Sequence, residues 1–192
     1  MESLYEVWSH RNPEWETRYQ ESIMDVFTDY GRGTTQYQSV RGKTFGAGYE
    51  AFIIAFFIGL YSNQTKPLVV DKAKRKSYGQ QIQYWGNQES RIGRTSYGKI
   101  REYIFAALVA RTDIDLIALD KGEISVKKVV DQLMDKMEQY ANFGFSYMQE
   151  KMEVDPNYFF KETAFLHTFL SFLNQDGNND VKTQDRSATP AG

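Results

Sequence analysis

Residues 45–62 read FGAGYEAFIIAFFIGLYS, and this stretch decides the fold. Glu50 is its only charged side chain. A helix that is apolar on all sides is normally buried. A membrane-spanning helix needs about 20 consecutive apolar residues, and this shorter segment also contains glycines and a carboxylate. We therefore predict a buried central helix over about 45–62 and no membrane association.

Helical signals recur on both sides of this segment. Asn12 followed by Pro13 is a typical helix start, and apolar positions then recur at helical spacing as far as Tyr30. Asn142 and Gly144 resemble a helix stop, and Asp155-Pro156 resembles another start. Further helices are expected over about 78–86, 97–111, 113–120, 125–142, 145–153 and 157–173. Leu68-Val69-Val70 is expected to form a short strand or a packed loop. Because helices are expected over most of the chain and strand signals are few, the sequence predicts a compact, multi-helix, all-α domain with at most a minor strand element.

The C-terminal end of the chain differs in composition from the helical part. Residues 174–192, NQDGNNDVKTQDRSATPAG, contain no aromatic residue and one large aliphatic residue, Val181. Such a segment cannot bury enough apolar surface to fold by itself. We expect a single domain over 1–173 and a disordered polar tail over 174–192.

The first residues, MESLYEVWSH, lack the basic and apolar regions of a signal peptide, which predicts a cytoplasmic protein.

The composition excludes several kinds of site. The 192 residues include no cysteine, which excludes disulfides, thiolate nucleophiles and cysteine-based zinc sites. The two histidines, His10 and His167, have no partner at metal-ligand spacing. We therefore expect no metal site and no cofactor.

Charge is unevenly distributed along the chain. Residues 1–31 hold two basic and seven acidic side chains, residues 32–111 hold 13 basic and four acidic ones, and residues 112–192 hold eight basic and 14 acidic ones. A basic middle between acidic ends indicates either a surface for a polyanion or a match between basic and acidic faces of the same chain.

In the basic zone, residues 32–111, aromatic and amide side chains are interleaved with the cations. Lysine and arginine neutralise phosphates, while aromatic rings stack on unpaired bases. This pattern favours a non-catalytic protein associated with DNA or RNA, or an accessory subunit of a nucleic-acid-processing complex. The residues expected to contact nucleic acid are Arg32, Arg41, Lys43, Lys72, Lys74, Arg75, Lys76, Arg91 and Arg94.

Two other function classes remain open on the sequence. The basic zone is equally suited to docking an acidic protein partner, as in an interaction or scaffold module. A small hydrolase would draw its carboxylates from Glu50, Asp113 and Asp115. Nothing in the spacing fixes these carboxylates at a working separation, and Asp113 and Asp115 suit a helix start. The pattern does not choose between DNA and RNA or between oligomeric states.

Overall fold

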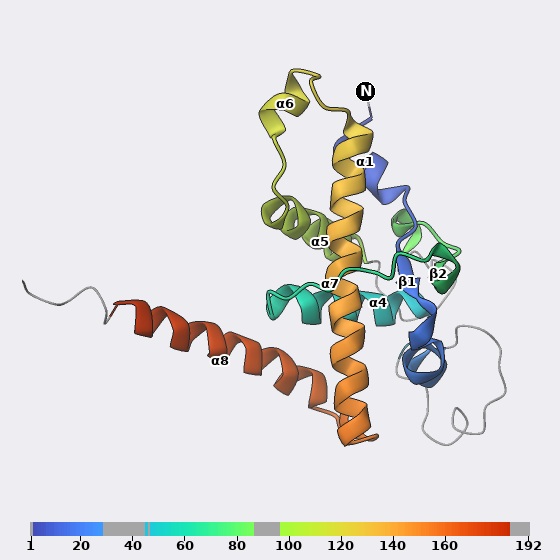
Figure 1. Ribbon diagram of the computed structural model, residues 1–192, viewed down its shortest axis with the longest axis vertical. Coiled ribbons are helices and arrows are strands. Elements are labelled where there is room, and N and C mark those ends of the chain that lie inside the picture. The colour runs from blue at the N-terminus through green and yellow to red at the C-terminus, as the bar shows by residue number, and fades with distance from the viewer. Residues whose placement is uncertain (1, 29–44, 46, 87–96, 185–192) are drawn as a thin grey trace, which may run out of the picture.

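Two crossing helices, α4 and α7, form the centre of the structure. The computed structural model describes residues 2–28, 45, 47–86 and 97–184, with side chains as far as residue 174. Helix α4 spans Gly48–Tyr61 and helix α7 spans Val126–Val154. The long α7 runs along most of the molecule, and α4 crosses it near its middle (Figure 1).

Helix α4 confirms the predicted central helix. Tyr49, Phe52, Phe56 and Ile58 are all buried, as are most of the other residues of α4. The aromatic rings of α4 contact rings from several elements: Tyr49 stacks on Trp85, and Phe52 meets Phe145 edge-on. Burial on all sides follows from the lack of any polar face on this helix.

Helix α7 corrects the expected stop at Asn142 and Gly144. The helix begins at Val126, where the Ser125 side chain accepts a hydrogen bond from the Lys128 N–H, and continues without interruption to Val154. Gly144 lies against α4: a Cβ atom there would be 1.9 Å from the carbonyl oxygen of Ala55. The glycine therefore marks a close helix crossing and does not end the helix.

The N-terminal segment also differs from its prediction. In place of one helix from Asn12, the chain forms α1 (Leu4–Ser9) and then strand β1 (Glu14–Glu16). A 3₁₀ turn (Thr17–Tyr19), a π-helical turn (Gln20–Met24) and the short α2 (Asp25–Phe27) follow. Pairing with a distant strand overrides the local helix signal, because it buries Trp15 against Tyr78.

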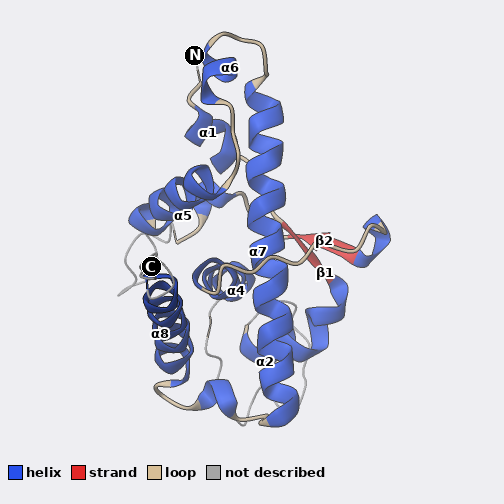
Figure 2. Ribbon diagram, turned by 60° about the vertical axis from the view of Figure 1, so that its left-hand side comes forward, coloured by secondary structure: helices blue, strands red, loops and turns tan. Residues whose placement is uncertain are grey.

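Strand β1 pairs in antiparallel fashion with β2 (Arg75–Ser77), and Glu16 lies opposite Arg75. We call these two strands the ribbon. The ribbon and helix α5 (Gly98–Arg111) lie on opposite sides of α7 (Figures 1 and 2). A 3₁₀ turn, Lys72–Lys74, leads into β2, and another, Ile82–Tyr84, occupies part of the helix expected over 78–86.

The remaining helices are α6 (Leu116–Asp120), a 3₁₀ turn (Tyr158–Phe160) and α8 (Ala164–Gln184). The helix expected from 157 starts later, because Asp155 accepts hydrogen bonds from the Asn157 N–H and from Lys161, which fix a turn. Helix α8 continues beyond residue 173, where the helix was expected to end and after which the tail was expected to begin. Since residues 185–192 lie outside the described part, the boundary at 173 stays a prediction.

The fold is thus an all-α domain with a minor two-stranded element, as the sequence predicts. Within the described residues, no helix combines the length and the apolar character needed to cross a bilayer.

Candidate interaction site on the ribbon

Four of the nine predicted nucleic-acid contacts lie together at the ribbon. Lys72 and Lys74 belong to the 3₁₀ turn before β2, and Arg75 and Lys76 belong to β2 itself. We call these four residues the basic patch. The other five, Arg32, Arg41, Lys43, Arg91 and Arg94, lie outside the described residues.

Two cations of the basic patch are held by an acidic residue of β1. The Lys72 Nζ atom lies 2.9 Å from Glu14 Oε2, and the Arg75 Nη1 atom lies 3.3 Å from the same oxygen. Arg75 also donates from Nε to the Val69 carbonyl, and its side chain is only 16% exposed. Burial favours a raised pKa for Glu14, but the hydrogen bonds from Lys72 and Arg75 outweigh it and hold this pKa below its ordinary value.

The other two cations of the patch are more accessible. Lys74 is 67% exposed and its Nζ atom lies 3.7 Å from Asp71 Oδ2, which is a loose pair. Lys76 is exposed, donates to the amide oxygen of Gln20 at 3.3 Å, and lies 6.0 Å from the ring centroid of Trp15. These two lysines are the members of the patch that a partner can reach without breaking a close ion pair.

A buried carboxylate, Glu16, connects the ribbon to α7. Its Oε2 atom lies 2.6 Å from Arg18 Nε, and its Oε1 atom accepts hydrogen bonds from the Val69 N–H and from Asn142 Nδ2. Asn142 also donates to the carbonyls of Lys66 and Pro67. A buried charge needs such partners, so this network fixes the segment 66–70 between β1 and α7.

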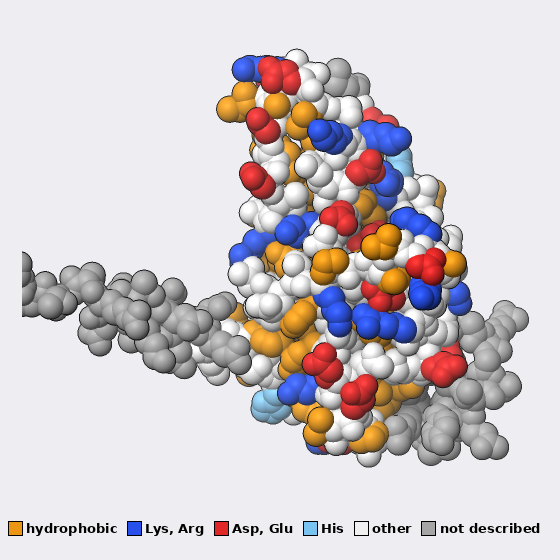
Figure 3. All heavy atoms as spheres, in the orientation of Figure 1, with side chains coloured by type: hydrophobic (Ala, Val, Ile, Leu, Met, Phe, Trp, Pro, Cys, Tyr) orange, Lys and Arg blue, Asp and Glu red, His pale blue; other side chains and the backbone are white. Residues whose placement is uncertain are grey.

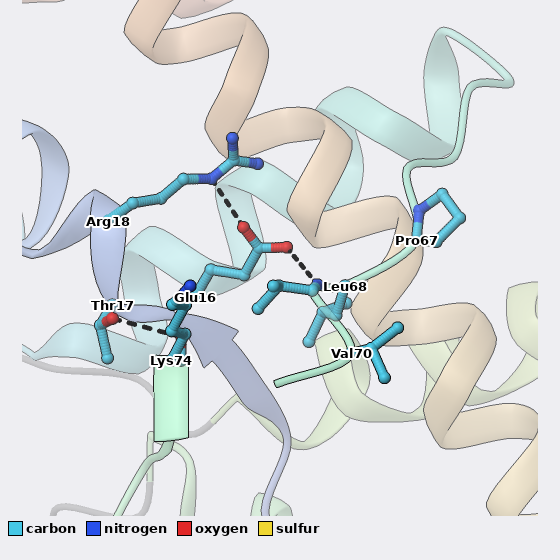
Figure 4. A pocket seen from close by; sticks show the side chains of 8 residues that line it. Glu16, Thr17, Arg18, Pro67, Leu68, Val70 and Lys74 are labelled. Carbon is cyan, nitrogen blue, oxygen red and sulfur yellow. Dashed lines mark hydrogen bonds and ion pairs between the residues drawn. The ribbon is translucent and has the colours of Figure 1, made fainter. Parts of the chain in front are cut away.

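Beside this network the surface is hollowed. The hollow has a volume of about 610 Å³ and opens to solvent. Figure 4 shows an apolar wall from the segment 67–70 on one side and the chain at 16–18 on the other. Its lining residues are Glu16, Thr17, Arg18, Pro67, Leu68, Val69, Val70 and Lys74.

A second acidic residue, Glu138 of α7, lies under the ribbon. It accepts a hydrogen bond from the Glu14 N–H at 2.8 Å. Burial raises the pKa of Glu138 to about 7, although the Glu14 N–H and the charges of Lys72 and Arg75 act against this shift. Glu138, Glu14 and Arg18 were not predicted from the sequence, because only the pairing of β1 with β2 and the packing of β1 on α7 bring these residues to the patch.

The predicted catalytic carboxylates have ordinary structural contacts. Glu50, in the first turn of α4, accepts a hydrogen bond from the Tyr97 hydroxyl at 3.2 Å. Asp115 caps α6 by accepting from the Ala118 N–H at 2.8 Å, and Asp113 is exposed just before it. Helices α6 and α4 lie at different heights along α7 (Figures 1 and 2). The structure therefore does not bring these carboxylates together as a catalytic pair.

Metal ligands are not grouped in the described part of the chain, where no three His, Asp or Glu side chains converge on a common point.

Comparisons with models of known families, with curated proteins and with solved structures give no match for this chain. The ribbon and the hollow beside it are therefore the features of this chain that bear on its function.

Proposed function

We propose that this chain is a non-catalytic protein-interaction module that docks an acidic segment of a partner on the ribbon. The observation that supports this proposal best is the composition of the hollow and its surroundings. An apolar wall lies beside a small excess of positive charge, because five cations face four carboxylates. The cations are Arg18, Lys72, Lys74, Arg75 and Lys76, and the carboxylates are Glu14, Glu16, Asp71 and Glu138. Apolar surface surrounded by complementary charge is typical of protein interfaces.

Association with nucleic acid, which the sequence favours, is less well supported by these contacts. A phosphate backbone would have to compete with Glu14 for Lys72 and Arg75. On the face seen in Figure 3, acidic and basic side chains are interspersed, and neither sign dominates a large area. Binding to DNA or RNA through phosphates instead needs several available cations along one track.

The test is a binding titration with a fluorescein-labelled peptide of alternating glycine and glutamate. We expect binding at low salt that weakens as salt is added, because the contacts are mainly between exposed charges. Lys74→Glu combined with Lys76→Glu should weaken binding by about tenfold or more, which corresponds to about 1.4 kcal/mol. Both side chains are exposed, so the fold should be preserved.

The matched control combines Lys127→Glu with Lys128→Glu, which changes the net charge equally at exposed positions of α7. This control should bind the peptide like the wild type. The proposal is wrong if the peptide fails to bind while duplex or single-stranded oligonucleotides bind with a steep dependence on salt. That result would restore the nucleic-acid function.

A further inference from the structure

The hollow beside the ribbon combines two kinds of surface that one ligand can satisfy together. Pro67, Leu68, Val69 and Val70 give it an apolar wall, and Val70 is 89% exposed although it is a large aliphatic residue. Arg18 and Lys74 belong to the opposite lining (Figure 4). A volume of about 610 Å³ is large enough for one or two side chains of a partner.

The charges that line the hollow favour an anion. Glu16 is the one carboxylate in the lining, and it is already compensated by Arg18 and by two hydrogen bonds. The Arg18 guanidinium uses Nε for Glu16 and Nη2 for the Tyr19 hydroxyl. A guanidinium carries five N–H donors, so Arg18 retains donors for a second acceptor. Lys74 adds a positive charge that is 67% exposed and only loosely paired, because its Nζ atom lies 3.7 Å from Asp71 Oδ2.

The apolar wall is held in place before any ligand binds. The Val69 N–H donates to Glu16, and the Val69 carbonyl accepts from Arg75 Nε at 2.5 Å. Asn142 holds the carbonyls of Lys66 and Pro67. A wall that is fixed in advance loses little conformational entropy on binding, which favours affinity.

We infer that this hollow is the anchor pocket for the acidic partner, and that it takes an apolar side chain adjacent to a carboxylate. The apolar side chain packs on Leu68 and Val70, and the neighbouring carboxylate lies near Arg18 and Lys74. This inference rests on the proposed function and adds the chemistry of the segment that the ribbon selects.

The experiment compares two labelled peptides of equal length and charge, one alternating leucine with glutamate and one alternating glycine with glutamate. The leucine peptide should bind the wild type about tenfold more tightly, because it buries apolar area that the glycine peptide lacks. Leu68→Ala should remove most of this advantage.

A second variant, Val70→Ser, covers the case in which Leu68→Ala loosens the segment. Val70 is almost fully exposed, so this change should not affect folding, and Val154→Ser at an 87% exposed position of α7 is its matched control. Equal affinities for the two peptides, or an advantage that persists in both pocket variants, would overturn the anchor pocket and leave the proposed function intact. Failure of both peptides to bind would overturn the proposed function itself.

Discussion

Single residues determine how closely the two central helices approach. At Gly144 a Cβ atom would be 1.9 Å from the carbonyl oxygen of Ala55, and at Gly59 it would be 2.2 Å from the carbonyl oxygen of Tyr140. Both contacts are with backbone atoms, which cannot rotate away as a side chain can. The glycines of α4 and α7 therefore fit reciprocally against the backbone of the opposite helix.

Gly144→Ala should strongly destabilise the protein. Alanine favours a helix over glycine by about 1 kcal/mol, but here its methyl group forces the helices apart and should lower the free energy of unfolding by about 3 kcal/mol. Urea unfolding monitored by circular dichroism measures the change. Gly79→Ala is the control, because no atom lies within 4 Å of the added methyl group. Equal stability of the two variants would contradict the tight crossing.

Glu138 should make stability depend on pH in an unusual direction. In the folded protein the Glu138 carboxyl group keeps its proton up to about pH 7, whereas the ordinary pKa of a glutamate side chain is 4.5. Between pH 4.5 and pH 7 the folded state binds a proton that the unfolded chain releases. The stabilisation that this proton gives the folded state is therefore complete below about pH 4.5, and it is lost as the pH rises through 7. Glu138→Gln should therefore gain stability relative to the wild type across this window, by up to about 3 kcal/mol.

The measurement is urea unfolding of Glu138→Gln and the wild type at several pH values between 4 and 8. Glutamine keeps the oxygen that accepts from the Glu14 N–H. Glu153→Gln, at an exposed position near the end of α7, should follow the wild type at every pH. Parallel curves for Glu138→Gln and the wild type would show that this carboxyl does not hold its proton.

At the scale of secondary-structure elements, the sequence indicated burial better than it indicated boundaries. Tyr19, Ile23 and Phe27 are fully buried, as their helical spacing predicts, although the segment starts with a strand and irregular turns. Apolar periodicity depends on the side chains and is visible locally. The strand at Glu14–Glu16 forms by pairing with β2, and the residues around it contain no signal that predicts pairing with a segment so distant in the sequence.

The attachment of the ribbon to α7 depends on Asn142, which donates hydrogen bonds to Glu16 and to two backbone carbonyls. Asn142→Asp is nearly isosteric but replaces the donor with a second buried carboxylate. We expect a loss of about 3–5 kcal/mol in stability at neutral pH, measured by urea unfolding. Asn174→Asp makes the same change at an exposed position of α8 and should have little effect. A mild effect at Asn142 would contradict the role of this network.

At the scale of the whole molecule, the basic patch was predictable from the sequence and its neutralisation was not. The density of cations around Lys72 and Arg75 is visible in the sequence, but their acceptor Glu14 lies 58 and 61 positions away from them. The hollow likewise forms between segments that only the ribbon brings together. The positive charge beside the hollow can therefore be predicted from the sequence, but the shape of the hollow cannot.

The end of α8 allows the predicted tail to be tested. A chain that ends at Asn174 should melt within a few degrees of the full chain, because the residues after it contain almost no core-forming side chains. Thermal unfolding followed by circular dichroism measures this directly. A cooperative loss of helix beyond the removed residues would show that the segment after 174 supports the domain.

The attachment of the N-terminal segment to α7 has a consequence for biosynthesis. Arg11 and Glu16 bond to side chains of α7 that are 120 and 126 positions further along the chain. At about 5–20 residues per second, a ribosome takes about 6–25 s to add that length. Throughout this interval Tyr19, whose ring packs on Phe145 of α7, lacks that helix, as do the other buried aromatic side chains of the first segment. We therefore expect the nascent chain to expose these aromatic residues until α7 has left the ribosome.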